Sequence, residues 1–208
     1  MINITAITVC VNYSDYLNLV LPNKYIFKKW LIVTIPEDKQ TIELCQRYSL
    51  DYCFSERIYE NGPFCKGKAI NDGILQLDPQ PSDWLCVVDA DTYLFPSIIE
   101  VLANTKLDKD YIYGLYGRVC VKDEDEFLQL LESNKDISDS LEHICLLAGF
   151  FQLWHSSIRP FYFEESTHAG LDDILMRDSY GHRTKFLPCY AIHIGELWIN
   201  HKGRVNGV

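Results

Sequence analysis

Two aspartates, Asp89 and Asp91, follow directly after the apolar run 84–88. This run is rich in β-branched and aromatic residues, which predicts a strand covered on both faces. Residues two apart in an extended segment point the same way, and ligand sites in open α/β sheets lie at the carboxyl ends of strands. The spacing therefore predicts that both carboxylates face one Mg²⁺ or Mn²⁺ ion, which would neutralise phosphate oxygens. The alternative is a polar turn after a buried strand, which explains one aspartate better than two.

A second acidic pair, Asp172 and Asp173, opens an apolar helical pattern near the end of the chain. One carboxylate is suited to cap the amino end of that helix, which leaves the other to act as a general base. His193 lies further on, between two isoleucines of the predicted strand 185–194. A lone histidine on an apolar strand is more often a core residue than a ligand, so its role depends on whether it lies opposite Asp89 and Asp91.

Two lysines, Lys66 and Lys68, stand near the amino end of the amphipathic helix predicted within 64–77. The helix dipole disfavours cations at this end, so their position favours an anion that shares the site. A solvated pair of lysines is the alternative.

The elements that must position these residues alternate between strand and helix. Strands are predicted at 2–11, 30–35, 51–54, 84–88, 111–121, 146–154 and 185–194. Helices are predicted at 39–48, within 64–77 and after Pro96. Strands and helices that alternate with short connections predict an α/β fold with a mostly parallel central sheet and helices on both faces. Asn12 and Tyr13 follow the first strand and are candidate base or ribose contacts, although Tyr13 is equally suited to packing.

The composition limits the classes of function. The 208 residues carry a formal net charge of -10 and a pI of about 5.0, which argues against a nucleic-acid-binding surface. No apolar stretch approaches the length of a membrane span. The 8 cysteines are scattered without a CxxC pair, which predicts reduced residues of a cytoplasmic protein. The small, polar segment 202–208 has the composition of a linker, which leaves open that these residues are one domain of a longer chain.

The ordered set of motifs resembles the nucleotide-sugar glycosyltransferases of the GT-A fold. Gly67–Asn71 (Gly-Lys-Ala-Ile-Asn) resembles the G-K-A-x-x-N helix of the family that includes chitin and cellulose synthases, and Val87–Asp91 matches its DxD motif. The pair Asp172 and Asp173 with the downstream Gly181 is similar to the family's catalytic E-D region. The resemblance implies one GT-A-like, Rossmann-type domain over 1–208, with a nucleotide-binding half over about 1–104 and an acceptor and catalytic half over about 105–208.

The resemblance also implies roles for single residues. Asp89 would approach the ribose or the metal, Asp91 would bind Mn²⁺ or Mg²⁺ through the diphosphate, and His193 would complete the metal shell. Asp172 or Asp173 would deprotonate the acceptor hydroxyl. The expected contacts of the nucleotide sugar are Val11, Asn12, Tyr13, Asp38, Lys68, Asn71, Asp89, Ala90 and Asp91. The expected donor is a UDP-sugar and the expected acceptor is a glycan or glycoprotein, whereas the sequence leaves the oligomeric state open.

The chain departs from the family pattern in two places. It has Leu-Asp-Asp where the family prefers Glu-Asp, which leaves open which aspartate is the base, and it lacks the Q-x-x-R-W motif of processive synthases. Small, cysteine-rich GT-A domains occur in large DNA viruses that glycosylate their capsids, and this chain is similar to them, which would place it in the host cytoplasm.

Two other functions are compatible with the motifs. A haloacid-dehalogenase-type phosphohydrolase also has an apolar strand followed by D-x-D-x-T, which Asp89, Asp91 and Thr92 satisfy. That motif normally opens its domain, whereas here three β/α units precede it. The other alternative is a nucleotide-sugar or glycan-binding module without catalysis.

Overall fold

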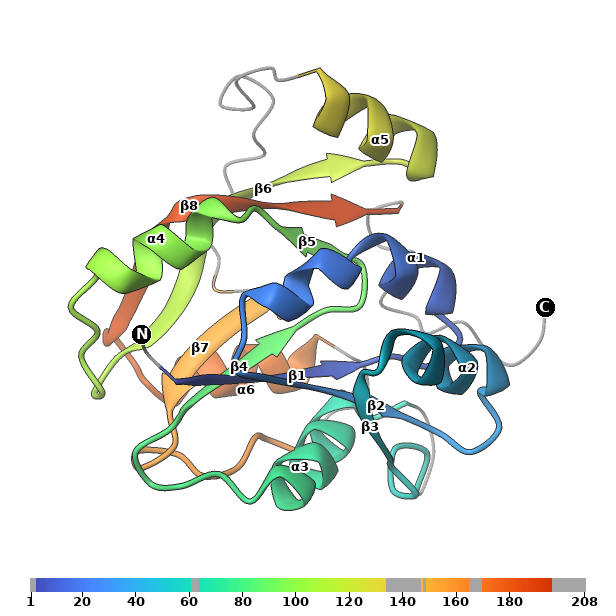
Figure 1. The fold of residues 1–208 in the computed structure, drawn as a ribbon. Helices are drawn as coiled ribbons and strands as arrows, with labels where there is room; N and C mark the ends of the chain where they lie inside the picture. The colour runs from blue at the N-terminus through green and yellow to red at the C-terminus, as the bar shows by residue number, and fades with distance from the viewer. Residues whose placement is uncertain (1–2, 61–63, 134–146, 148, 165–169, 196–208) are drawn as a thin grey trace.

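One eight-stranded sheet runs through the part of the chain that the computed structural model describes, which is residues 3–60, 64–133, 147, 149–164 and 170–195. The strands are β1 (Ile4–Val9), β2 (Lys29–Thr34), β3 (Asp51–Phe54), β4 (Trp84–Val88), β5 (Thr92–Leu94), β6 (Ile112–Val121), β7 (Phe151–His155) and β8 (Thr184–Ile194). Their order across the sheet is β3-β2-β1-β4-β7-β6-β8-β5 (Figure 1). The α/β class predicted from the sequence is confirmed.

The first four strands of this order form a parallel unit. β1 pairs with both β2 and β4, and β2 pairs with β3, all in parallel. The carboxyl ends of these strands therefore meet at one edge of the sheet, as the alternation of strands and helices predicts.

The other four strands mix directions. β7 is antiparallel to β4 and to β6, β6 is parallel to β8, and β5 is antiparallel to β8 at the edge. The sequence did not predict β5, which has only three residues and begins one residue after Asp91. The buried side chain of Asn23 holds β5 from outside the sheet: its Nδ2 donates to the Thr92 carbonyl at 2.7 Å, and its Oδ1 accepts from the Leu94 amide at 2.9 Å.

Helices cover both faces of the sheet, as predicted. They are α1 (Ser14–Leu19), the 3₁₀ helix η1 (Leu21–Tyr25), α2 (Lys39–Tyr48), α3 (Lys66–Leu77), α4 (Ser97–Asn104), α5 (Glu124–Glu132) and α6 (Leu171–Asp178). α3 and α6 lie on one face, and α1 and α2 on the other (Figure 1). None of the helices in the described part of the chain is both long and apolar enough to span a membrane.

Apolar residues fill two cores, one on each side of the sheet. On β1 the alternation is direct, because Ala6 belongs to the core under α1 and α2 while Ile7 belongs to the core under α3 and α6. α3 lies close to the sheet at Gly73, where an added Cβ would come 2.8 Å from Cγ2 of Val33. This packing fixes the amino end of α3 relative to the edge where β1, β2 and β4 end.

Candidate active site

The Asp89-Ala90-Asp91 turn lies at the carboxyl end of β4, where the sequence predicts it. The Asp89 amide donates to the Phe150 carbonyl at 3.3 Å, and the Thr92 amide donates to the Asp89 carbonyl at 3.2 Å. The side chain of Asp89 is 31% exposed, whereas that of Asp91 is 9% exposed. The two aspartates therefore leave the same tight turn into different surroundings.

His193 lies beside Asp91, which answers the question that the sequence leaves open. β5 and β8 pair so that Thr92 is opposite His193, and the Ile194 amide donates to the Asp91 carbonyl at 2.8 Å. Nδ1 of His193 lies 3.4 Å from Oδ1 of Asp91. This nitrogen is buried, and within the described part of the chain it has no hydrogen-bond partner. A buried imidazole nitrogen beside a carboxylate fits a divalent ion such as Mn²⁺.

Asp89 does not join these two residues. In the residues that the structure describes, no three His, Cys, Asp or Glu side chains are grouped closely enough to hold a metal. The structure therefore brings two of the three predicted metal ligands together, Asp91 and His193, and gives Asp89 a different partner. A metal at this pair would take its remaining ligands from a bound molecule or from water.

The partner of Asp89 is Lys66. From the sequence, Lys68 and not Lys66 is the lysine expected to contact the nucleotide sugar. The buried ammonium of Lys66 lies 2.6 Å from Oδ1 of Asp89 and 3.2 Å from Oδ2 of Asp173, and it donates to the Gly149 carbonyl at 3.2 Å. Burial alone would lower the pKa of Lys66, but the Asp173 and Asp89 carboxylates outweigh it and raise that pKa. Burial raises the pKa of Asp89, and Lys66 opposes that rise. The anion expected near this helix end is thus a pair of the protein's own carboxylates.

The helical period of α3 is a signal that could have identified Lys66. Positions three, four, seven and eight residues after Lys66 are Ala69, Ile70, Gly73 and Ile74, all buried. Lys66 therefore belongs to the face that packs on the sheet. Lys68 does not share this spacing.

Asp173 lies in a buried polar cluster. The Tyr162 hydroxyl is 2.7 Å from its Oδ1 and 2.5 Å from Oε1 of Gln152, and Nε2 of Gln152 donates to the Asp173 carbonyl at 3.0 Å. Burial, followed by the negative charge of Asp173, raises the pKa of Tyr162. A Cβ added to Gly149 would lie 1.7 Å from Oδ2 of Asp173, so only glycine allows the carboxylate to come this close.

Asp172 is fully buried and acts on another helix. Its Oδ2 accepts the Gly67 amide in the first turn of α3 at 2.8 Å. The prediction that one aspartate of this pair caps its own helix is wrong, because the N-cap residue of α6 is Gly170 and no side chain caps this helix. Asp172 can reach across to α3 because Gly67 lacks a side chain: a Cβ there would lie 2.7 Å from Oδ2 of Asp172 and 1.6 Å from the Phe163 carbonyl oxygen.

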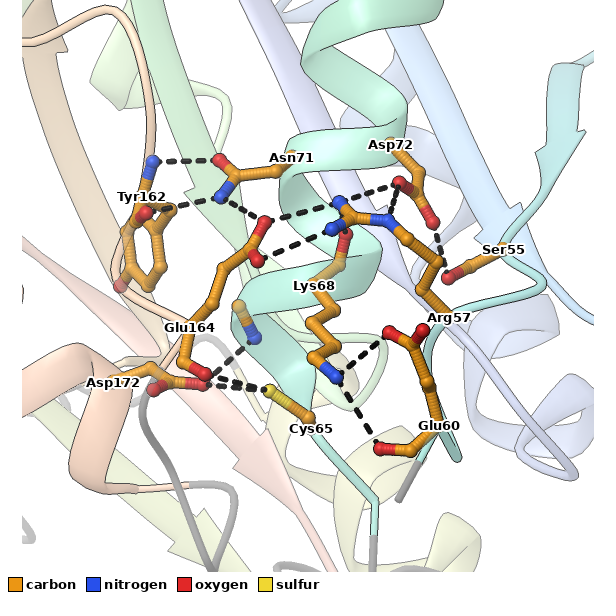
Figure 2. A network of polar contacts seen from close by, with 11 residues as sticks. Ser55, Arg57, Glu60, Cys65, Lys68, Asn71, Asp72, Tyr162, Glu164 and Asp172 are labelled. Carbon is orange, nitrogen blue, oxygen red and sulfur yellow. Dashed lines mark hydrogen bonds and ion pairs between the residues drawn. The ribbon is translucent and has the colours of Figure 1, made fainter. Parts of the chain in front are cut away.

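Lys68 and Asn71 belong to a network of polar contacts around α3 (Figure 2). The Lys68 ammonium pairs with Oε2 of Glu60 at 3.0 Å. Nδ2 of Asn71 donates to the Tyr162 carbonyl at 3.0 Å and to Oε1 of Glu164 at 2.7 Å, and its Oδ1 accepts from the Tyr162 amide at 2.6 Å. Both side chains thus tie α3 to neighbouring segments, and their contacts with a nucleotide sugar stay predictions.

The remaining predicted contacts lie at the ends of β1, β2 and β4. Asp38 caps α2 through the Thr41 amide at 3.1 Å and also accepts the Asn12 amide at 2.7 Å, while the ring of Tyr13 packs against Tyr16. Val11 and Ala90 are buried, so a nucleotide would meet their backbone rather than their side chains. These residues share the edge predicted for the nucleotide, and their contacts with it stay predictions.

Comparison with known proteins identifies the class of fold. No protein-family model matches the chain, and no curated protein sequence matches it. Among solved structures, mannosyl-3-phosphoglycerate synthase from Rubrobacter xylanophilus has a TM-score of 0.55 and 12% identity, over 94% of this chain and 67% of that one. Glucosyl-3-phosphoglycerate synthase from Mycobacterium tuberculosis, in complex with Mn²⁺, UDP and glucosyl-3-phosphoglycerate, has a TM-score of 0.56 and 11% identity, over 93% and 72%.

A third similar structure is that of an enzyme whose name gives another reaction. It is the inositol-1-phosphate CTP transferase from T. maritima, with a TM-score of 0.50 and 10% identity, over 94% of this chain and 89% of that one. The chain also covers 65% of the length of a mycobacterial protein with a TM-score of 0.53 and 13% identity. The chain therefore has the α/β fold of GT-A-like nucleotide-sugar and nucleotidyl transferases.

Proposed function

We propose that this protein is a metal-dependent glycosyltransferase that moves a sugar from a nucleotide diphosphate sugar, a UDP-sugar, to an acceptor hydroxyl. The observation that carries the proposal is the pairing of Asp91 with the buried Nδ1 of His193 at the end of β4. A DxD turn at the carboxyl end of a parallel strand lies where α/β sheets bind nucleotides. The fold shared with an enzyme solved with Mn²⁺ and UDP supports the same conclusion.

Asp91 and His193 would hold Mn²⁺ or Mg²⁺, and Asp89 would face the ribose or the metal. When bound, such an ion stabilises the negative charge that develops on a diphosphate leaving group. Val11, Asn12, Tyr13 and Asp38 would form the nucleotide edge, with Lys68 and Asn71 further along α3.

The base that takes the acceptor proton would be Asp172 or Asp173, and the contacts favour Asp173. The Lys66 ammonium touches both Asp89 and Asp173, so Asp173 borders the DxD turn. Asp172 has no exposed surface and uses one oxygen to cap α3. A general base must come within hydrogen-bond reach of the proton that it removes, and it contributes about 10²- to 10⁴-fold to the rate.

Calorimetric titration of UDP with and without Mn²⁺ tests the proposal. We expect the wild-type protein to bind UDP in a Mn²⁺-dependent manner, and Asp91→Asn to weaken this binding about tenfold or more, because a ligand of the ion is lost. Asp110→Asn removes an exposed carboxylate far along the chain from the turn and should leave binding unchanged. The metal site would be refuted if the affinity for UDP is the same with and without Mn²⁺ and the same in the wild type and in Asp91→Asn.

The identity of the products separates the other candidate functions. Nucleotidyl transfer, supported by the fold shared with the CTP transferase, would release pyrophosphate from a nucleoside triphosphate. A phosphohydrolase that uses Asp89 and Asp91 would turn over p-nitrophenyl phosphate but no UDP-sugar. A binding module without catalysis would show no turnover that depends on Asp172 or Asp173.

We propose a glycan or glycoprotein as the acceptor and the cytoplasm as the location, the host cytoplasm if the protein is viral. The seven cysteines of the described residues are all free thiols, which supports a reducing compartment. Fractionation with transfer assays on candidate acceptors would test both points.

A further inference from the structure

Arg118 on β6 carries a charge that the described part of the protein does not balance. Its Nε is buried without a hydrogen-bond partner, and no carboxylate of the described residues pairs with its guanidinium. Its guanidinium lies over an aromatic ring instead: Cζ is 5.2 Å from the centroid of the Phe150 ring. A buried polar group without a partner costs free energy, so an arginine held in this way is suited to an anion that comes from outside.

The sheet register places Arg118 on the same face as His193. In the parallel pair of β6 and β8, Cys120 is in register with His193 and Arg118 is in register with Ala191. Partners in register point to the same face of a sheet, and so do residues two apart on one strand. Arg118 is therefore one step along the strands from the histidine that pairs with Asp91.

A second set of contacts connects Arg118 to the other side of the site. Phe150, under the guanidinium, accepts the Asp89 amide through its carbonyl. The preceding residue, Gly149, accepts from the Lys66 ammonium that touches Asp173. The ring on which Arg118 stacks is thus directly connected to the turn and to the proposed base.

We propose that Arg118 binds an oxyanion of the acceptor, so that the acceptor is a hydroxyl compound that also carries a phosphate or a carboxylate group. This inference rests on the proposed function and names the substrate class for it. The guanidinium presents its donors as a fixed fork that matches either oxyanion in a bidentate manner, and the Phe150 ring supports it from one side. An acceptor held there would border His193 across β6 and β8 and the Asp89 turn through Phe150.

Inorganic phosphate and acetate are the probes, because they represent the two oxyanions without the rest of the acceptor. Each is titrated onto ¹⁵N-labelled protein, once alone and once saturated with UDP and Mg²⁺. The Nε–H signal of Arg118 is followed in the wild type, and the backbone amide signals of Arg118's neighbours give the probe affinity of every variant. The Nε–H signal that disappears in Arg118→Lys is that of Arg118, which assigns it. The same variant keeps the positive charge but lacks the forked donors of the guanidinium. Arg118→Gln removes the charge. Arg183→Gln is the matched control, because Arg183 is also stacked on a ring, that of Tyr180, but lies just before the opposite end of β8.

We expect at least one probe to shift the Arg118 signal in the UDP-saturated protein. The affinity for that probe should fall about 10- to 100-fold in Arg118→Gln, since a hydrogen-bonded charge is lost. It should fall less in Arg118→Lys and not at all in Arg183→Gln. A response to phosphate alone identifies a phosphorylated acceptor, and a response to acetate alone identifies a carboxylate.

The same experiment contains the results that would overturn the inference. The proposed anion site at Arg118 is refuted if neither probe shifts the Arg118 signal of the wild-type protein. It is also refuted if the probe affinity is unchanged in Arg118→Gln. A loss of UDP affinity of tenfold or more in Arg118→Gln assigns the arginine to the donor instead. If the protein fails to bind UDP yet phosphate still moves the Arg118 signal in the unloaded sample, the proposed function falls and the anion site stands. Should Arg118→Gln not fold, the wild-type signal and Arg118→Lys decide.

Discussion

At the scale of single residues, the site depends on one ammonium group shared by two carboxylates. Lys66 lies between Asp89 of the DxD turn and Asp173 of α6, with the Gly149 carbonyl as its third partner. Removing one member of a buried ion pair leaves an uncompensated charge, which costs far more than an exposed pair contributes. Lys66 therefore both stabilises the fold and fixes the position of the Asp89 turn relative to Asp173 of α6.

Replacing Lys66 with methionine should lower the free energy of unfolding by about 3–5 kcal/mol, because Asp89 and Asp173 lose their counter-charge. Urea denaturation at neutral pH measures this. Lys28→Met, at an exposed position, is the control and should change stability by less than about 0.5 kcal/mol. The double variant Lys66→Met with Asp173→Asn should cost less than the sum of the single changes. Strict additivity would show that the pair is not coupled.

Gly149→Ala tests the close approach of backbone to carboxylate. The new Cβ would overlap Asp173 and push it away from Lys66, so transfer should be lost and stability should fall by about 1–3 kcal/mol. Gly181→Ala is the control: its φ of +58° strains any side chain, but nothing lies within 4 Å of the added Cβ, so transfer should continue. Equal transfer by the two variants would contradict this account of Gly149.

At the scale of elements, α3 connects the parts of the site. Its first turn presents Lys66 and Gly67 to the two aspartates of α6, while its second turn presents Asn71 and Asp72 to the network of Figure 2. In that network Arg57 pairs with Asp72 at 2.7 Å and with Glu164 at 3.0 Å. The segment before α6 is thereby fastened to α3 by partners more than 90 residues away along the chain.

Glu164→Gln should change how stability depends on pH. Burial alone would raise the pKa of Glu164, but hydrogen bonds from Arg57 and Asn71 lower it below its ordinary value of 4.5. A carboxyl group whose pKa is lowered in the folded state adds stability above its unfolded pKa and loses it as the pH falls through the folded pKa. The wild type should therefore be more stable than the variant at pH 7, and the difference should vanish in acid.

The difference at pH 7 should stay within about 1 kcal/mol, because both partners of the ion pair are about one-third exposed and water screens them. Urea unfolding at a series of pH values measures it. A difference that persists unchanged below pH 3 would mean that the carboxylate charge does not stabilise this contact.

At the scale of the whole molecule, the sheet brings the two halves of the chain to one site. β7 inserts between β4 and β6, so the strands that carry Arg118 and His193 continue the sheet that begins with β3, β2 and β1. β5 then returns along β8 and sets Asp91 beside His193. β5, which precedes the predicted boundary near residue 104, thus pairs with a strand that follows it, so the strands of the two predicted halves interleave in one sheet.

Asn23→Ala tests how this return is held. Two backbone groups of β5 lose a buried partner, so the free energy of unfolding should fall by about 2–4 kcal/mol. Mn²⁺ affinity should fall as well, because β5 positions Asp91. Asn18→Ala, exposed on α1, is the control and should change neither quantity. If Asn23→Ala lowers stability but leaves the Mn²⁺ affinity unaltered, the metal site does not depend on the position of β5.

The sequence by itself determined the parallel strands, the helices between them and the position of the DxD turn. These features depend on local patterns: uninterrupted apolar runs predict buried strands, and a carboxylate after such a run must lie at the edge of the sheet. The α/β class and the placement of helices on both faces followed from the same patterns.

Only the tertiary structure decided which charges meet. Lys66 and Asp173 are 107 residues apart, as are Cys65 and Asp172, and nothing in either local segment specifies the other. The same holds for Asn23, which binds β5 across 69 residues. Local periodicity predicts which face of an element is buried. The partner of a buried polar group depends instead on how the elements pack against one another. In this protein that packing gives Lys66 two aspartates as partners and gives Lys68 an exposed glutamate.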